Sequence, residues 1–287
     1  LFRFTFPESD SSVVVIDAFA GGSMVKIIPA ERKVIGYCRN NHGGVPENFH
    51  NYFVIIFDRD FSFSCATLDG KPLPGSTEQS GDHAAAVIGF RTERGEQVTA
   101  RVASSFISHE QALLNLERET GDRDFDMVRD AAKERWNSEL GRIRVEGGTE
   151  DQVRTFYSTL YRTLLFPRMF HEYDSEEKIV HYSPYNGQVL PGRLYTDNGF
   201  WDTFRAAMPL LTLLYPDVSS QIMEGLVNAY LESGWLPEWA SPGHRNCMIG
   251  SNSASLIADA YLKGIRGYDI DTLRNAMVKN SKGHGPV

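Results

Sequence analysis

The sequence has few cysteines, no dense basic cluster and no long apolar run, and each of these absences argues against a class of protein. Its three cysteines, Cys38, Cys65 and Cys247, are widely separated and form no CxxC pair, so neither a zinc site nor a disulfide framework is indicated. The net charge of −8 and the scattered Lys and Arg residues argue against a nucleic-acid partner. The longest apolar stretches, at 52–57 and 208–215, fall short of the ~20 residues that span a bilayer, so we expect no membrane insertion.

Both ends of the sequence suggest that it is part of a longer protein. It opens with LFRFTFPESD, which alternates as a strand does and has neither a start Met nor the regions of a signal peptide. It closes with NSKGHGPV immediately after a predicted helix. Because so few helices would leave an apolar face uncovered, we expect further helices beyond Val287.

Residues 1–110 are predicted to form an antiparallel β-sandwich domain. Short β-branched or aromatic segments alternate with Gly, Pro, Asn and Asp turns, a spacing typical of such domains. The predicted strands lie at 13–16, 24–28, 34–37, 52–57, 61–65, 85–90 and 98–106.

The pattern changes to helices after residue 110. Residues 111–148 are charged and helix-favouring, with an apolar face from Phe125 to Trp136, and we expect a packed helical linker. Residues 149–287 are predicted to form a helical domain. Its first helix should begin at a capping box made by Thr149 and Gln152, and its later helices should cover 203–215, 219–233, 253–263 and 271–280.

A long polar segment with scattered aromatics, from Arg168 to Phe200, separates the first two of these helices. Loops of this length in a compact domain are usually functional or disordered, and the aromatics argue against disorder, so we expect part of a site here. His171, Glu172, Asp174 and His181 resemble metal ligands in type. They match neither an EF-hand nor an HExxH spacing, and we expect a solvated loop instead.

A Trp stands beside an Asp where a polar turn meets an apolar segment, in TDNGFWDTFRAAMPLLTLLYP. The pair suits sugar recognition, because the indole of Trp201 can pack on the apolar face of a pyranose while the Asp202 carboxylate accepts hydrogen bonds from two hydroxyls. The structural alternative places Trp201 in the core and Asp202 at the N-cap of a helix starting at Thr203. In either case Arg205 is placed to pair with Asp202.

The segment ESGWLPEWASPGHRNCMIGS, residues 232–251, combines aromatic surface with hydrogen-bonding groups, as carbohydrate clefts do. Trp235 and Trp239 flank Glu238, which is by itself a weak candidate acid. The alternative is a rigid turn whose two indoles cover helix ends.

Six segments together resemble a known family. They are LFRFTFPESD, SSFISHEQALLNLERE, TFYSTLYRTLLFPRMF, GFWDTFRAAMPLLTLLYP, GWLPEW and NCMIGSNSASLIADAYLKGI, and they span nearly the whole chain. In this order they resemble the signature blocks of glycoside hydrolase family 92, the calcium-dependent exo-α-mannosidases. Ser251, Asn252 and Ser253, which follow CMIG, depart from the acidic and His pairing more usual there, which leaves contacts at that point in doubt.

The resemblance implies a fold and an activity. The fold would be an N-terminal antiparallel β-sandwich, a helical linker and the first helices of an (α/α)6 toroid. The activity would be inverting hydrolysis of terminal α-linked mannose, α-1,2-linked mannose of N-glycans or mannans being the expected substrate, by a secreted or periplasmic enzyme. Inversion needs an acid and a base about 6.5–9.5 Å apart. The implied calcium would bind O2 and O3 of the sugar.

The resemblance carries over two residues, Trp201 and Asp202, as contacts to the terminal mannose. The acid, the base and most calcium ligands are expected beyond Val287, so no catalytic or metal-binding residue is assigned, and we expect this chain alone to be inactive. Two alternatives stay open. One is a non-catalytic carbohydrate-binding protein in which residues 1–110 bind glycan, and the other is an (α/α)6 enzyme of different specificity, such as a glycoside phosphorylase.

Overall fold

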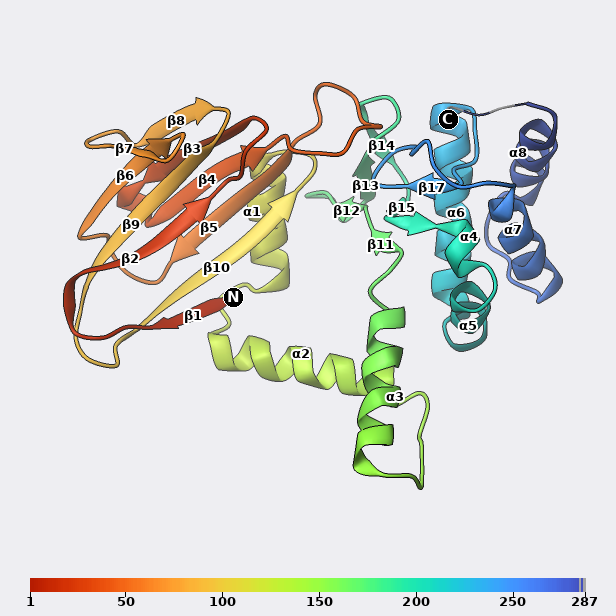
Figure 1. The fold of residues 1–287 in the computed structure, drawn as a ribbon, viewed down its shortest axis with the longest axis horizontal. Helices are drawn as coiled ribbons and strands as arrows, with labels where there is room; N and C mark the ends of the chain where they lie inside the picture. Colours follow the sequence, from red (N-terminus) through yellow and green to blue (C-terminus); the bar gives the residue numbers. More distant parts are fainter. Residues whose placement is uncertain (284, 286–287) are drawn as a thin grey trace. The chain divides into compact units, whose positions relative to one another are not determined.

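The structure, a computed structural model, describes residues 1–283 and 285 and divides the chain into two compact units (Figure 1). Unit 1 comprises Leu1–His42 and Phe49–Lys133, and unit 2 comprises Gly43–Asn48 and Glu134–Val287. A short loop that interrupts unit 1 therefore belongs to unit 2. The division into residues 1–110, 111–148 and 149–287 stays a prediction.

Unit 1 contains two antiparallel sheets. The six-stranded sheet has the order β1-β10-β5-β4-β3-β8, with strands Phe2–Thr5, Gln97–Ser105, Asn51–Phe57, Lys33–Cys38, Ser23–Ile28 and Glu78–Gly81. The four-stranded sheet has the order β2-β9-β6-β7, with strands Ser9–Asp17, Ala84–Thr92, Phe63–Leu68 and Lys71–Leu73. A one-turn 3-10 helix, Pro29–Glu31, joins β3 to β4.

One core lies between the two sheets. In β3 the buried side chains alternate with partly exposed ones, and Val25 and Ile27 face inward. Strand β9 of the other sheet contributes Ile88 and Phe90 to the same cluster. Two sheets that share one apolar layer form a sandwich, so the predicted antiparallel, sheet-rich first half is confirmed.

Two helices follow the sandwich strands. Helix α1, His109–Glu119, begins at Ser108, whose hydroxyl accepts a hydrogen bond from the Gln111 N–H (3.1 Å), and it packs on β10 and β5. Helix α2, Phe125–Leu140, has no fully buried residue. Its expected apolar face is only half covered, for instance where the Trp136 ring meets Tyr161 with 4.6 Å between centroids.

The first helix that lies wholly in unit 2 is α3, Glu150–Thr163, where the predicted capping box between Thr149 and Gln152 is present. The following segment is more regular than its sequence indicates, because it forms short antiparallel strand pairs. These strands are β11 (Arg168–Met169), β12 (Glu172–Tyr173), β13 (Ile179–Tyr182), β14 (Val189–Pro191), β15 (Tyr195–Thr196) and β16 (Asn198–Gly199), with β17 (Trp239–Ala240) pairing to β16. Elements of two to four residues leave no period that a sequence reading can detect.

Helices α4 to α8 surround a second core that includes Met223, Leu226, Ile257 and Leu273. They span Phe200–Thr203, Ala207–Leu214, Pro216–Ser233, Asn252–Leu262 and Ile270–Lys282. None of the helices in the described residues is long and apolar enough to cross a bilayer.

The prediction of one continuous helix over 203–215 is wrong. The helix is broken between α4 and α5, where Ala206 leaves the helical region with φ −136°. The physical reason is Pro209, which lacks an N–H and whose ring would clash with the carbonyl of residue 205 in a continuous helix. The break places Pro209 in the first turn of α5, where a proline is tolerated.

Candidate functional site

A two-stranded pairing brings the Trp-Asp motif next to the second aromatic segment. Gly199 in β16 lies opposite Trp239 in β17, and the N–H of Phe200 donates to the carbonyl oxygen of Glu238 (3.0 Å). Residues about 40 positions apart in the sequence thus become neighbours within unit 2. The two segments that the sequence analysis describes separately as suited to carbohydrate therefore lie next to each other.

Trp201 and Asp202 lie on α4 and face solvent. The N-cap of α4 is Gly199, so the alternative in which Asp202 caps a helix starting at Thr203 is wrong. Trp201 keeps 41% of its surface exposed, which also excludes the core position considered for it. Its indole and the neighbouring exposed carboxylate are therefore accessible to a ligand.

Arg205 does not form the expected ion pair with Asp202 within the described residues. Its guanidinium donates to the carbonyl oxygen of Trp201 (2.6 Å) and lies over the Trp201 ring, 5.0 Å from the centroid. It also lies 4.4 Å from the Phe204 ring centroid. The Arg205 guanidinium thus packs on the Trp201 indole. The Asp202 carboxylate makes no ion pair among the described residues.

Gly199 is the point on which three side chains converge. A methyl group added at Gly199 would lie 2.8 Å from Asp202 Oδ2, 3.4 Å from Met248 Cε and 3.7 Å from Trp239 Cδ2. The absence of a side chain at this position lets the Asp202 carboxylate lie close to the strand pair. Asp202 is thereby placed beside the loop that follows β17.

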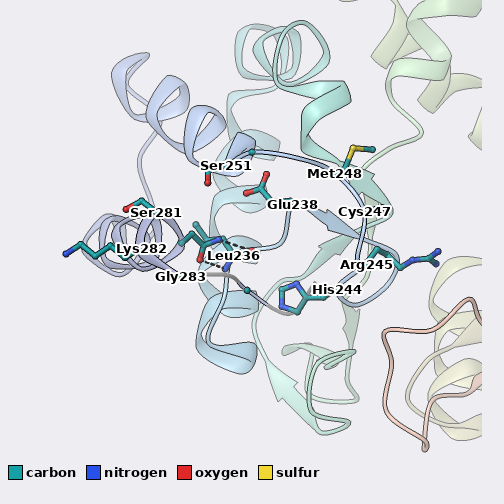
Figure 2. Close-up of a pocket in the computed structure, with 13 residues that line it drawn as sticks. Leu236, Glu238, His244, Arg245, Cys247, Met248, Ser251, Ser281, Lys282 and Gly283 are labelled. Atoms are coloured by element: carbon teal, nitrogen blue, oxygen red, sulfur yellow. Dashed lines mark hydrogen bonds between the residues drawn. The ribbon is translucent and has the colours of Figure 1, made fainter.

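That loop and the helix ends near it surround a cavity of about 440 Å³ in unit 2 (Figure 2). Polar groups dominate its lining, and they include Glu238, His244, Arg245, Ser251, Asn280 and Lys282. Trp201 and Asp202 do not line the cavity itself. Met248 does, and it is also one of the side chains that converge on Gly199.

Glu238 lies in the wall of this cavity and is held by three hydrogen bonds from the start of α7. Its Oε2 accepts from the N–H groups of Asn252 (2.7 Å) and Ser253 (3.3 Å), and its Oε1 accepts from the Ser253 hydroxyl (2.6 Å). Burial raises the pKa of Glu238, and these hydrogen bonds oppose that rise because they favour the ionised form.

His244 is a half-buried imidazole whose role is not evident from the sequence. Its ring lies against Tyr185 with 4.7 Å between centroids, and its Nε2 has no hydrogen-bond partner. Burial lowers the pKa of His244 to about 4, so the ring is neutral at pH 7. Burial likewise raises the pKa of Tyr185, and the charge of Glu232 adds to this effect.

The loop from Ser241 to Ser251 is fixed by contacts on two sides. The Thr196 hydroxyl donates to the Pro242 carbonyl (2.7 Å), and the Ser241 hydroxyl donates to Asp197 (2.9 Å). On the other side, a methyl group added at Gly243 would lie only 1.9 Å from the carbonyl oxygen of Gly44. The segment 43–48 therefore packs tightly against this loop within unit 2.

The prediction of a solvated loop around His171 and His181 is wrong for both histidines, which are buried. His181 Nδ1 donates to the Gly192 carbonyl (2.8 Å), while Nε2 lies 2.9 Å from Glu232 Oε1. His171 Nδ1 donates to the Leu194 carbonyl (3.2 Å). These imidazoles anchor the short strands to α6 and to each other, a function that needs three-dimensional neighbours to be recognised.

Among residues 1–283 and 285, no group of three or more His, Cys, Asp or Glu side chains is placed to hold a metal ion. We assign no calcium ligand to these residues, and calcium stays an expectation of the family resemblance.

Comparison with known proteins gives matches over nearly the whole chain. Residues 1–105 match the model of the glycosyl hydrolase family 92 N-terminal domain, and residues 111–286 match that of the glycosyl hydrolase family 92 catalytic domain.

Solved structures agree. A family 92 inverting mannosidase from Bacteroides thetaiotaomicron VPI-5482 is 50% identical with a TM-score of 0.95, over 98% of this chain and 38% of its own. A family 92 α-mannosidase from Bacteroides thetaiotaomicron, solved with mannoimidazole, is 27% identical with a TM-score of 0.88, again over 98% of this chain and 38% of its own.

A curated relative from Arthroderma benhamiae, described as an uncharacterized secreted glycosidase, is 29% identical over 196 residues, 66% of this chain. The chain spans 38% of the length of the two solved relatives and 21% of the curated one.

Proposed function

The chain belongs to glycosyl hydrolase family 92, and from this we propose that it forms part of an inverting exo-α-mannosidase that acts on terminal α-linked mannose. The mannosidase names of two solved relatives support the substrate class. We further propose α-1,2-linked mannose of N-glycans or mannans as the substrate and secretion, or export to the periplasm, as the location. The description of the curated relative as secreted supports the location.

The exposed pair on α4 carries this proposal. The Trp201 indole is 41% exposed, and the adjacent Asp202 carboxylate makes no ion pair within the described residues. An aromatic face and an ionised acceptor side by side match a pyranose, whose C–H groups pack on the ring while its hydroxyls donate to the acid. We propose that this pair holds the terminal mannose and that the cavity beside Met248 belongs to the same site.

Hydrolysis with inversion also requires a catalytic acid and a catalytic base, and we assign neither role to these residues. A general acid must protonate the leaving oxygen, and a carboxylate base must activate a water about 6.5–9.5 Å from the acid. The best-placed carboxylate of the cavity, Glu238, has both oxygens occupied by donors of α7. We propose that the acid and the base come from the part of the family's length that residues 1–287 do not match, so that these residues alone do not hydrolyse mannosides.

Calcium is proposed on the same basis. The family resemblance supports it, and its ligands would lie outside the described residues. In the full-length protein, a chelator should abolish hydrolysis of α-1,2-mannobiose and added calcium should restore it. Unchanged activity after exhaustive chelation would refute the calcium proposal without affecting the assignment of Trp201 and Asp202.

Substitution of the α4 pair tests the proposal directly. In the full-length protein, Asp202→Asn should lower kcat/KM by roughly 10-fold or more, because a hydrogen bond to a charged group is lost. Trp201→Ala should raise KM for α-1,2-mannobiose by roughly 10-fold, because the sugar loses an aromatic surface. Leu213→Ala and Asp271→Asn remove an exposed apolar side chain and a first-turn carboxylate elsewhere, and should leave both constants unchanged.

Two outcomes would count against the proposal. If both α4 variants match the wild type in kcat and KM, the pair does not contact the sugar. If the full-length protein hydrolyses no α-mannoside but binds mannose, a non-catalytic binding protein is the better description.

A further inference from the structure

We propose that Glu238 is a positioning residue of this site, which ties the start of α4 to the start of α7 and so holds Trp201 and Asp202 in their binding geometry. The inference rests on the proposed function for its activity readout. It deepens that proposal, because it identifies a side chain that maintains the site by holding other groups in place.

The backbone of Glu238 makes the first of the two connections. Its carbonyl oxygen accepts from the N–H of Phe200, the first residue of α4, at 3.0 Å. The first N–H groups of a helix have no partner within that helix, and no side chain caps α4. The position of Glu238 therefore determines where α4 starts and where the two residues after Phe200 lie.

The carboxylate of Glu238 makes the second connection. The N-cap of α7 is Ser251, whose side chain makes no capping hydrogen bond. Glu238 caps the helix instead, although it lies outside α7. Its carboxylate accepts from the N–H groups of Asn252 and Ser253 and from the Ser253 hydroxyl. A negative charge at a helix N-terminus is also favoured by the helix dipole.

The two connected helices belong to one packed group. Helices α4 and α7 contact each other, and Met248, just before α7, lies beside Asp202 near Gly199. Ser253 is almost completely buried, so its hydroxyl has no solvent to replace Glu238. Removal of the carboxylate would leave two N–H groups and one hydroxyl without an acceptor, at a point that both helices share.

This geometry distinguishes a positioning residue from a catalytic acid. A catalytic acid carries its proton on an oxygen that faces the leaving group. Both oxygens of Glu238 instead accept hydrogen bonds from α7, Oε1 from Ser253 at 2.6 Å and Oε2 from Asn252 at 2.7 Å. Glu238 thus accepts hydrogen bonds from groups of the protein itself, and its role is to hold those groups in place.

Conservative and non-conservative variants separate the two roles in the full-length protein. In Glu238→Gln, the amide oxygen can accept both N–H groups while the amide nitrogen donates to the Ser253 hydroxyl, which can serve as donor or acceptor. We therefore expect E238Q to keep kcat and KM within about threefold on α-1,2-mannobiose. Glu238→Ala should raise KM roughly 10-fold or more, because the site loses its geometry.

Hydrogen–deuterium exchange supplies a readout that does not depend on activity. The amides of Asn252 and Ser253 should exchange faster in E238A than in the wild type, and the amide of Phe200 should follow if α4 and α7 are tied together. All three should stay protected in E238Q. Ser253→Ala, which removes only one of the three donors, should give an intermediate result and serves in place of E238A if that variant does not fold.

Glu224→Ala is the matched control. Glu224 is a half-buried carboxylate of the same unit that pairs with Arg193 at 3.0 Å, away from α4. It should alter neither KM nor exchange at Phe200, so a general loss of stability is excluded as the cause of the E238A result.

Each remaining outcome is decisive. Equal losses of kcat in E238Q and E238A would overturn the inference and identify Glu238 as a catalytic group. Unchanged exchange at all three amides in E238A would overturn it as well. If the wild-type protein lacks mannosidase activity, the proposed function fails, and the exchange data alone then decide whether Glu238 ties the two helices.

Discussion

Acid should weaken unit 2 through His244, and the size of the effect follows from its burial. In the unfolded chain His244 takes up its proton near pH 6.5, whereas burial in the fold lowers its pKa to about 4. A histidine whose folded pKa is lowered stabilises the fold above the unfolded value, and this stability is lost as the pH falls towards the folded value. Between these two values the native state loses about 1.4 kcal/mol per pH unit, or about 3 kcal/mol in all.

The tryptophan fluorescence of the chain reports on unit 2, which contains His244. All four tryptophans, Trp136, Trp201, Trp235 and Trp239, lie in unit 2. Urea unfolding followed by tryptophan fluorescence at several pH values between 7 and 4 therefore gives the stability of unit 2 as a function of pH.

The variant His244→Phe isolates the effect. It keeps an aromatic ring against Tyr185 and removes both the titrating group and the unpartnered Nε2. The wild type should lose about 3 kcal/mol more than H244F between pH 7 and pH 4. His171, whose pKa is also lowered by burial, contributes equally to both proteins and cancels in the comparison. A pH dependence that is identical in wild type and H244F would refute the reasoning, and His42→Gln, at an exposed histidine, should change nothing.

Two further substitutions test the supports of unit 2. Gly243→Ala would place a methyl group 1.9 Å from the Gly44 carbonyl and 2.9 Å from the Pro184 carbonyl, and because neither backbone group can turn aside, unit 2 should lose about 3 kcal/mol in urea unfolding. Thr149→Ala removes the hydroxyl that accepts from the Gln152 N–H and should cost about 1 kcal/mol in the same assay, whereas Thr159→Ala, in the middle of α3, should cost clearly less; equal losses would contradict the capping role.

Local signals in the sequence predicted local structure well. The capping box at Thr149 was predicted because its two residues lie three positions apart and need no distant partner. The break before Pro209 was missed, although the residue is visible in the sequence, because apolar periodicity continues through it. The two-residue strands were missed because they are stabilised by partners and have no pattern of their own.

The site was predictable only in part, since its residue types are visible but its assembly is not. The Trp-Asp motif stood out by composition, and family resemblance indicated its role. The β16–β17 pairing joins segments about 40 residues apart, and no local sequence feature predicts this pairing. Glu238 looks like an isolated acid between two tryptophans, and only the position of α7 reveals that its carboxylate is already occupied.

The assignment of residues 43–48 to unit 2 has a practical consequence for anyone who dissects or recombines this protein. A fragment that starts at Glu134 would leave out Gly44, and the loop around Gly243 would be missing one of its walls. If the sandwich were exchanged for that of a homologue, the segment equivalent to residues 43–48 would come with it and would replace part of unit 2. The β4–β5 connection is therefore where natural variation in length could remodel the site without altering any residue of the helices themselves.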